Sequence, residues 1–138
     1  MSAALLDTDV LIDHLRGHRR LDLFDPAWKI SVVTRCELFA GRNTHEPSLQ
    51  RTLELIDELP VDRVIAESAG RIRRKTQLDI PDALIAATAL EHGLSIMTRN
   101  RRHFERVANL VVRSPEDEPE SESNPRPESS KPSSGSVE

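Results

Sequence analysis

The sequence contains one cysteine, no long apolar run and no internal repeat. Cys36 stands alone among 138 residues, which excludes an intrachain disulfide and leaves it without a partner for a thiolate metal site. A reducing compartment therefore suits the chain, and we expect Cys36 to be a small buried residue. The N-terminal residues lack the pattern of a signal peptide, and no later run approaches membrane-spanning length. These absences predict a cytoplasmic protein with no membrane contact.

Charge is distributed unevenly along the chain. The segment from Ser114 onward holds seven acidic residues against Arg126 and Lys131, a net charge of −5, so the whole-chain charge of −4 leaves +1 for residues 1–113. The same segment is rich in Pro, Ser and Glu and almost free of apolar residues, so it cannot bury enough surface to offset its ordering entropy. We therefore expect one folded domain at 1–113 and a disordered acidic tail at 114–138.

The arginines of residues 1–113 are clustered. They gather at 19–20, at 71–75 and at 99–106, and a helix starting near Asp62 would place Arg71, Arg74 and Lys75 on one basic ridge. Such patches on a nearly neutral domain are compatible with a phosphate backbone as partner. They are equally compatible with solvated helix faces, and charge alone leaves both interpretations open.

Short apolar runs alternate with amphipathic segments, a pattern typical of an α/β fold with a parallel sheet. Strands are predicted at 3–6, 28–34, 94–98 and 110–112, with a connector or fifth strand at 59–61; helices are predicted from residue 7, at 34–41, 47–58, from residue 62 and at 80–93. Thr34 and Glu37 have the spacing of a capping box. The helix at 80–93 is apolar nearly all round, with Pro81 at its start and Gly93 after its end, which predicts a buried helix.

Four polar residues follow strands or begin helices at equivalent places: Asp7, Glu37, Asp82 and Asn100. Each has an ordinary structural explanation, since Asp7 can cap a helix, Glu37 can complete a capping box, Asp82 can complement a helix dipole and Asn100 can sit in a turn. Three carboxylates at one sheet edge would nevertheless repel one another unless a cation shared them. An oxygen-only set favours Mg²⁺, with Mn²⁺ as a possible substitute, over Zn²⁺.

Four motifs together resemble the PIN-domain ribonucleases of the VapC toxin kind. They are Leu5-Leu6-Asp7-Thr8-Asp9-Val10-Leu11-Ile12, Thr34-x-x-Glu37-Leu38-x-x-Gly41, Pro81-Asp82-Ala83-Leu84-Ile85-Ala86-Ala87-Thr88-Ala89 and Thr98-Arg99-Asn100-x-x-His103-Phe104. The resemblance spans about residues 3–112. It implies a three-layer α/β/α sandwich around a mostly parallel sheet of four or five strands. It also implies a Mg²⁺-dependent endoribonuclease, often a homodimer, that a cognate VapB-like antitoxin holds inactive.

The same resemblance implies roles for individual residues. Asp7 and Asp82 would be metal ligands, Glu37 would complete an acidic triad that activates a water, and Asn100 would belong to the catalytic set. Many PIN domains carry Asp where this chain has Asn100, although Asn is familiar there among toxin-like members. Asp9 stands where toxin relatives often have Asn, either adding charge near the metal or lying on the surface. Arg99, Arg101 and Arg102 could contact the RNA backbone, which gives affinity without sequence choice.

Two other functions fit parts of the sequence. Asp7-Thr8-Asp9 after an apolar strand also resembles the nucleophile motif of haloacid-dehalogenase-type phosphatases, in which Asp7 would form an aspartyl-phosphate. That chemistry needs a downstream lysine and usually a later acid pair, but only Lys75 lies mid-chain and no Asp-Asp pair occurs. A non-catalytic module that binds RNA or a partner is the third possibility, and the presence of all three acids argues against it.

Overall fold

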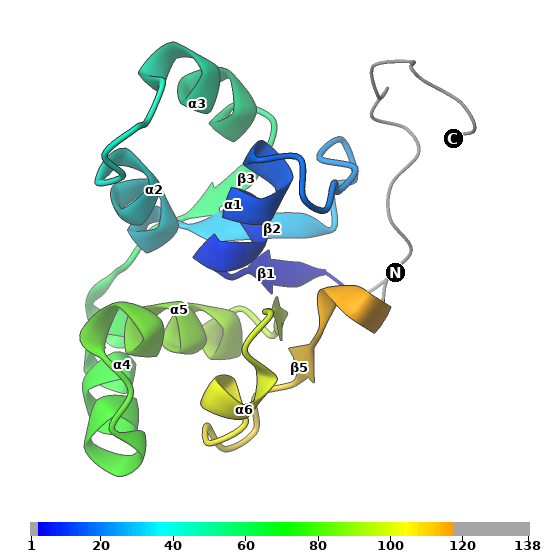
Figure 1. Cartoon of the computed structure of the whole chain (residues 1–138). Helices are drawn as coiled ribbons and strands as arrows, with labels where there is room; N and C mark the ends of the chain where they lie inside the picture. Colours follow the sequence, from blue (N-terminus) through cyan, green and yellow to red (C-terminus); the bar gives the residue numbers. More distant parts are fainter. Residues whose placement is uncertain (1–2, 118–138) are drawn as a thin grey trace.

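The structure, a computed structural model, describes residues 3–117 (Figure 1). The elements in chain order are β1 (Ala4–Leu6), α1 (Thr8–Leu15), β2 (Trp28–Ser31), α2 (Val32–Phe39), α3 (Glu46–Leu53), β3 (Asp57–Leu59), α4 (Arg63–Thr76), α5 (Ile80–Glu91), β4 (Ser95–Met97), α6 (Arg101–Phe104), β5 (Val112–Arg113) and the short 3-10 helix η1 (Pro115–Asp117). Most of the expected acidic tail, from residue 118 onward, lies outside the described residues. Within residues 3–117, no helix combines the length and apolarity needed to cross a membrane.

The five strands form one sheet in the order β3-β2-β1-β4-β5, and every neighbouring pair is parallel. From β1 the chain moves to β2 on one side, whereas from β4 it moves to β5 on the other. β1 and β4 are therefore adjacent strands whose following connections leave in opposite directions. Such a switch point opens a crevice at the carboxyl ends of the two strands, where α/β proteins bind ligands. Asp7 follows β1 and Thr98 follows β4, so both residues stand at this crevice.

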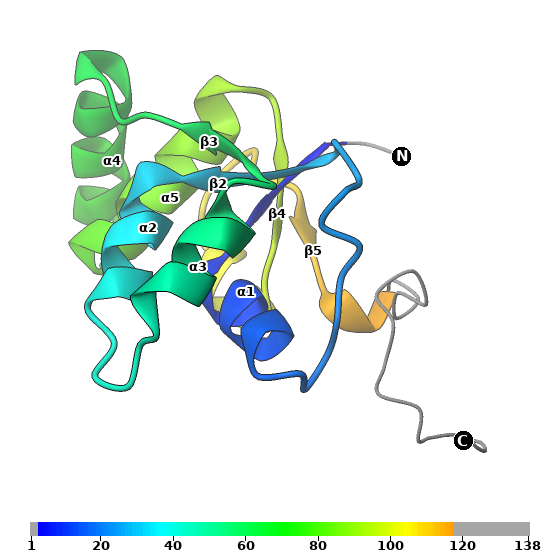
Figure 2. The ribbon, with the colours of Figure 1, turned by 90° about the horizontal axis from the view of Figure 1, so that it is seen from above.

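Helices cover both faces of the sheet (Figures 1 and 2). Ala4 and Leu6 of β1 pack into one core with α1, α2 and α3, while Leu5 packs into the other core with α4, α5 and α6. Successive strand side chains point to opposite faces, so a fully apolar strand serves two cores at once. The alanines of α5 that face this core are fully buried, and their small size lets the helix lie close to the sheet. The predicted three-layer α/β/α sandwich is confirmed.

The start of α2 differs from the sequence prediction. The N-cap is Ser31, whose Oγ accepts a hydrogen bond from the backbone N–H of Val33 at 3.0 Å, so Thr34 and Glu37 do not form a capping box. Thr34 instead lies in the first turn with a fully buried side chain. Cys36 is exposed, and the prediction that it is buried is wrong. The reason is helical geometry: Thr34 and Leu38 share the buried face, and a residue midway between them points away from it.

The predicted helix at 47–58 is also too long. α3 ends at Leu53, and Asp57 and Glu58 lie in strand β3 at the edge of the sheet. Their carboxylates pair with cations of the neighbouring β2 and α2: Lys29 Nζ lies 3.0 Å from Asp57 Oδ2, and Arg35 Nε lies 2.6 Å from Glu58 Oε1. Pairing with β2 thus overrides the local helical pattern. The periodicity of the sequence does not predict this, because the pairing depends on a distant segment.

Candidate active site

The residues singled out in the sequence line one cavity at the carboxyl edge of the sheet. The cavity has a volume of about 300 Å³, and its walls include Asp7, Glu37, Asp82 and Asn100 together with Thr8, Asp9, Ile12, His103 and Phe104. These side chains come from the ends of β1 and β4 and from helices α1, α2, α5 and α6. The tertiary structure therefore brings the four candidate residues together, as the sequence predicts.

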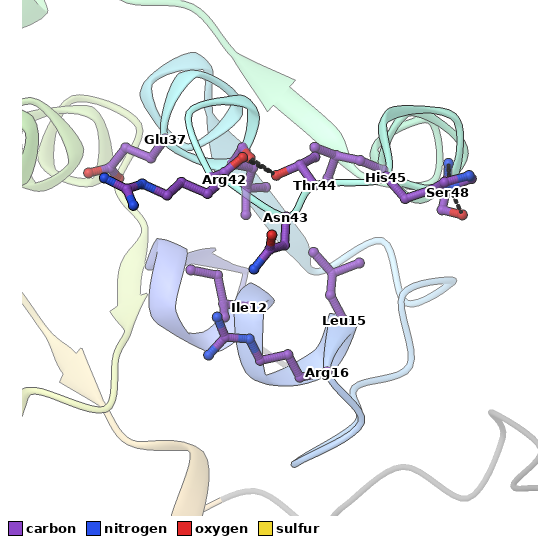
Figure 3. A pocket seen from close by; sticks show the side chains of 12 residues that line it. Ile12, Leu15, Arg16, Glu37, Arg42, Asn43, Thr44, His45 and Ser48 are labelled. Atoms are coloured by element: carbon purple, nitrogen blue, oxygen red, sulfur yellow. Dashed lines mark hydrogen bonds between the residues drawn. The ribbon is translucent and has the colours of Figure 1, made fainter.

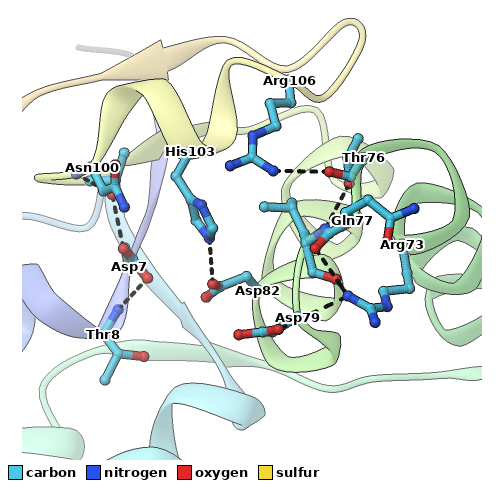
Figure 4. A network of polar contacts seen from close by, with 12 residues as sticks. Asp7, Thr8, Arg73, Thr76, Gln77, Asp79, Asp82, Asn100, His103 and Arg106 are labelled. Carbon is cyan, nitrogen blue, oxygen red and sulfur yellow. Dashed lines mark hydrogen bonds and ion pairs between the residues drawn. The ribbon is translucent and has the colours of Figure 1, made fainter.

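Asp7 is both a helix cap and the most buried acid of the cavity. Its Oδ1 accepts a hydrogen bond from the backbone N–H of Thr8 at 2.9 Å, and its Oδ2 accepts one from Thr98 Oγ1 at 2.9 Å (Figure 4). The side chain is only 6% exposed. Burial raises the pKa of Asp7 to about 6; the hydrogen bond from Thr98 opposes this, and repulsion from Asp9 and Asp82 adds to it. A charged Asp7 is thus held where its charge is poorly solvated.

Glu37 is positioned by two buried threonines. Thr8 Oγ1 lies 2.5 Å from Glu37 Oε1 and 3.0 Å from Thr34 Oγ1. An ionised carboxylate can only accept, so the single hydroxyl proton of Thr8 goes to Glu37, and Thr8 must then accept from Thr34. The direction of both hydrogen bonds follows from this. Thr8 therefore links the Asp7 end of the cavity to Glu37.

Asp82 lies in the first turn of α5 and contacts His103. Asp82 Oδ2 and His103 Nε2 are 2.8 Å apart, and Figure 4 shows the two side chains pointing toward each other across the cavity wall. His103 belongs to the fourth motif but not to the predicted site. Its signal in the sequence is its spacing, three residues after Asn100, which places the two residues one turn apart: Asn100 is the N-cap of α6 and His103 lies within that short helix.

The predicted basic contacts have different surroundings. Arg99 lies 3.3 Å from Asp13 Oδ2 and 3.8 Å from Asp9 Oδ2. Arg101 lies 3.2 Å from Glu105 Oε2 and 3.3 Å from Asp117 Oδ2. Arg102 is exposed. Two of the three cations beside the acidic cavity thus already have acidic partners.

The donor set of this cavity fits a hard divalent cation. Oxygen, the atom that Mg²⁺ and Mn²⁺ prefer, comes from four carboxylates, Asp7, Asp9, Glu37 and Asp82, and from the Asn100 amide. Burial without a neutralising partner also keeps the pKa of Asp7 raised, as expected for a carboxylate that a cation would relieve. Within residues 3–117, no three His, Cys, Asp or Glu side chains lie close enough together to enclose an ion. Mg²⁺ commonly takes only one or two carboxylates and keeps water on its other positions.

A larger groove adjoins the acidic cavity. It has a volume of about 600 Å³ and runs between α1, α2 and α3, with Ile12, Leu15, Leu38 and Leu49 among its lining residues and arginines at its edge (Figure 3). Ile12 and Glu37 line both spaces, so the groove and the acidic cavity share a wall. The loop that closes it requires Gly41, because a Cβ there would lie 2.8 Å from Thr44 Oγ1.

Fold and site together define an α/β protein with a carboxylate-lined cavity at the switch point of a parallel sheet. The sequence model of the PIN domain matches residues 4–110, and the chain belongs to the PIN domain family. Ribonuclease VapC1 of Methanocaldococcus jannaschii is 33% identical over 119 residues, covering 81% of this chain and 86% of the relative. Ribonuclease VapC10 of Mycobacterium tuberculosis is 38% identical over 112 residues, covering 72% and 84%.

A solved structure shows the same similarity in three dimensions. A chain of a toxin-antitoxin complex from Klebsiella pneumoniae superposes with a TM-score of 0.70 and 32% sequence identity, covering 82% of this chain and 98% of that chain. The resemblance to VapC-type PIN domains that the four motifs indicate is confirmed.

Proposed function

We propose that this protein is the toxin of a toxin–antitoxin pair and acts as an endoribonuclease in the cytoplasm. The observation that carries the proposal is the convergence of Asp7, Glu37 and Asp82 from three different elements on one cavity. The relatives named ribonucleases support RNA as the substrate, and their similarity extends over most of this chain. RNA enzymes of this size usually act on unpaired segments, so we take single-stranded RNA as the substrate class.

In the proposed reaction, Asp7 and Asp82 would hold Mg²⁺, for which Mn²⁺ could substitute. When bound, the cation supplies positive charge against the phosphate oxygens and lowers the pKa of water. Glu37 orients the attacking water and accepts its proton. The hydrogen bonds from Thr34 to Thr8 and from Thr8 to Glu37 keep that carboxylate aimed into the cavity.

Water attacks the scissile phosphorus in line, the bond to the 3′-oxygen breaks, and the leaving 3′-oxygen takes up a proton from solvent water. The products carry a 5′-phosphate and a 3′-hydroxyl, as the family resemblance implies. Asn100 lines the same cavity and has an amide that can donate a hydrogen bond to a phosphate oxygen. Arg99, Arg101 and Arg102 stay candidates for contacts with the RNA backbone.

We also propose a VapB-like antitoxin as the partner and a homodimer as the assembly. The Klebsiella structure is of a toxin-antitoxin complex, which supports a partner of that kind. The 600 Å³ groove offers apolar side chains along its floor and Arg16 and Arg42 among its lining, and it suits a segment with apolar and acidic residues (Figure 3). Because Glu37 lies in the shared wall, a segment seated there would reach the acidic cavity.

The proposed function is tested by expressing the intact chain and an Asp82→Asn variant and sequencing the RNA ends. We expect new 5′-phosphate ends with the intact chain and none with the variant. Asp79→Asn is the matched control. Asp79 is the N-cap residue of α5, three residues before Asp82, but it does not line the cavity, so cleavage should persist.

Three results would contradict the proposal. If the purified Asp82→Asn variant still cleaved RNA, Asp82 would not be part of the catalytic site. Hydrolysis of a small phosphomonoester without action on RNA would indicate a phosphatase with Asp7 as its nucleophile. Binding of RNA without Mg²⁺ and without cleavage of any RNA tested would indicate a non-catalytic binding module.

A further inference from the structure

A second cavity, with basic walls, lies along α4. It has a volume of about 270 Å³ and is lined by the second half of α4, by Leu90 near the end of α5 and by the segment that follows α6. Three cations line it: Arg71, Lys75 and Arg106. No Asp or Glu of the described part of the chain is among its lining residues. Figure 4 shows Arg106 and Thr76 on the opposite side of Asp82 from Asp7.

These cations keep most of their charge available. Arg106 is held in place because its Nη1 donates to the backbone carbonyl of Thr76 at 3.0 Å, and a guanidinium has further N–H groups for another acceptor. Arg71 lies 3.8 Å from Glu67, but both side chains are about 60% exposed and such a pair is weak. For Lys75 the structure of residues 3–117 gives no ion pair or hydrogen bond.

Helix electrostatics accounts for only part of this arrangement. Lys75 belongs to the last turn of α4, where a cation complements the helix dipole. Arg106, however, comes from another element, and Arg71 precedes the last turn. Of the basic ridge expected from the sequence, Arg71 and Lys75 line the cavity, whereas Arg74 does not. Cations from separate segments thus line one cavity that has no Asp or Glu among its described lining residues. This arrangement points to an anionic ligand.

We propose that Arg71, Lys75 and Arg106 form a subsite for the phosphate backbone of a single-stranded RNA whose scissile bond lies in the acidic cavity. The inference rests on the proposed function for the position of the scissile bond. The two cavities share one stretch of chain: His103 lines the acidic one and Arg106 the basic one. His103 and Arg106 are three positions apart in the sequence, so their Cα atoms are at most about 11 Å from each other. An RNA of a few nucleotides can therefore span both cavities.

The test compares RNA binding by charge-matched variants in a Glu37→Gln background, which keeps the substrate intact. One protein carries Arg71→Gln, Lys75→Gln and Arg106→Gln; the control carries Arg51→Gln, Arg63→Gln and Arg74→Gln, which removes the same charge from positions outside the cavity. A labelled oligouridylate of about 12 nucleotides is titrated by fluorescence anisotropy from about 50 to 300 mM KCl. A uridine trimer of about the length of one subsite is titrated in parallel.

We expect the subsite variant to bind the longer RNA roughly tenfold more weakly than the control. The slope of log K against log salt should be shallower by about 0.7 for each phosphate that the variant no longer neutralises. Binding of the trimer should change less, because a trimer has only two phosphodiester groups to place against the acidic and basic cavities. If the triple variant does not fold, Lys75→Gln alone gives the same comparison, because Lys75 is exposed.

Equal affinities and equal salt slopes for the subsite and control variants would overturn the inference. If the parent chain cleaves RNA and this difference is missing, only the subsite fails. If the parent chain cleaves no RNA but the difference persists, the proposed nuclease activity fails and the RNA subsite stands.

Discussion

Asp7→Asn should stabilise the cation-free protein while abolishing its proposed activity. Burial raises the pKa of Asp7 from 3.8 to about 6, so the folded state binds this proton more tightly than the unfolded chain does. Each pKa unit corresponds to about 1.4 kcal/mol, so ionising Asp7 above pH 6 lowers the free energy of unfolding by up to about 3 kcal/mol. Asn removes the charge, and it keeps the N-cap of α1 because Asn and Asp cap equally well.

The sign of the pH dependence follows from the raised pKa. The stabilising contribution of the Asp7 proton is fully present below about pH 3.8 and is lost as the pH rises through about 6. We therefore expect Asp7→Asn to exceed the parent in stability at pH 7.5 and the difference to vanish near pH 4. Burial, and to a smaller extent Arg20, lower the pKa of His14 and favour its neutral ring. The contribution of His14 to stability is therefore lost as the pH falls below 6.5, which is the opposite direction to that of Asp7. His14 is present in both proteins, so it cancels in the difference.

The assay is urea unfolding at several pH values in a chelating buffer, followed by the fluorescence of Trp28, the only tryptophan and a buried one. Adding Mg²⁺ or Mn²⁺ should stabilise the parent, by about 2.7 kcal/mol at a hundred times the dissociation constant, and leave Asp7→Asn unchanged. Asp79→Asn, outside the cavity, serves as the control. A stability difference that does not vary with pH, or a variant less stable than the parent at pH 7.5, would refute the electrostatic reasoning.

Three further predictions concern single side chains. Thr8→Val should lower kcat about a hundredfold with little change in KM, because Glu37 loses its hydrogen-bond donor, and Thr8→Ser should restore most of the rate. His103→Ala should weaken Mn²⁺ binding about tenfold in a calorimetric titration, because Asp82 loses the partner that orients it; His92→Ala, on the exposed end of α5, should not. Ala86→Leu should lower the free energy of unfolding by about 1 to 3 kcal/mol through overpacking beneath the sheet, whereas Ala66→Leu, exposed on α4, should be nearly neutral in the same urea experiment.

The layout of the fold and the places of the acids follow largely from local patterns in the sequence. The short apolar stretch at Ala4–Leu6 is typical of a strand buried on both faces, which the structure confirms, and polar residues that directly follow such a strand lie at its carboxyl edge. Asp7 and Asn100 could be assigned to that edge for this local reason, whereas Asp82 begins helix α5, which follows helix α4 and not a strand. Glu37 was placed just after the second predicted strand, and its helix was located correctly although its capping role was not.

The contacts that hold these side chains in place depend on how distant segments pack. Thr8 meets Thr34 and Glu37 across 26 and 29 residues of sequence, and His103 meets Asp82 across 21. Strand β3 exists because β2 lies beside it, in a segment whose own pattern is helical. Such contacts depend on strand order and register, which arise when distant segments pack together. The periodicity of a segment does not specify which distant side chain each of its residues will contact. The hydrogen bonds that support the acidic cavity and the basic cavity along α4 therefore could not be predicted from the sequence and were found only in the structure.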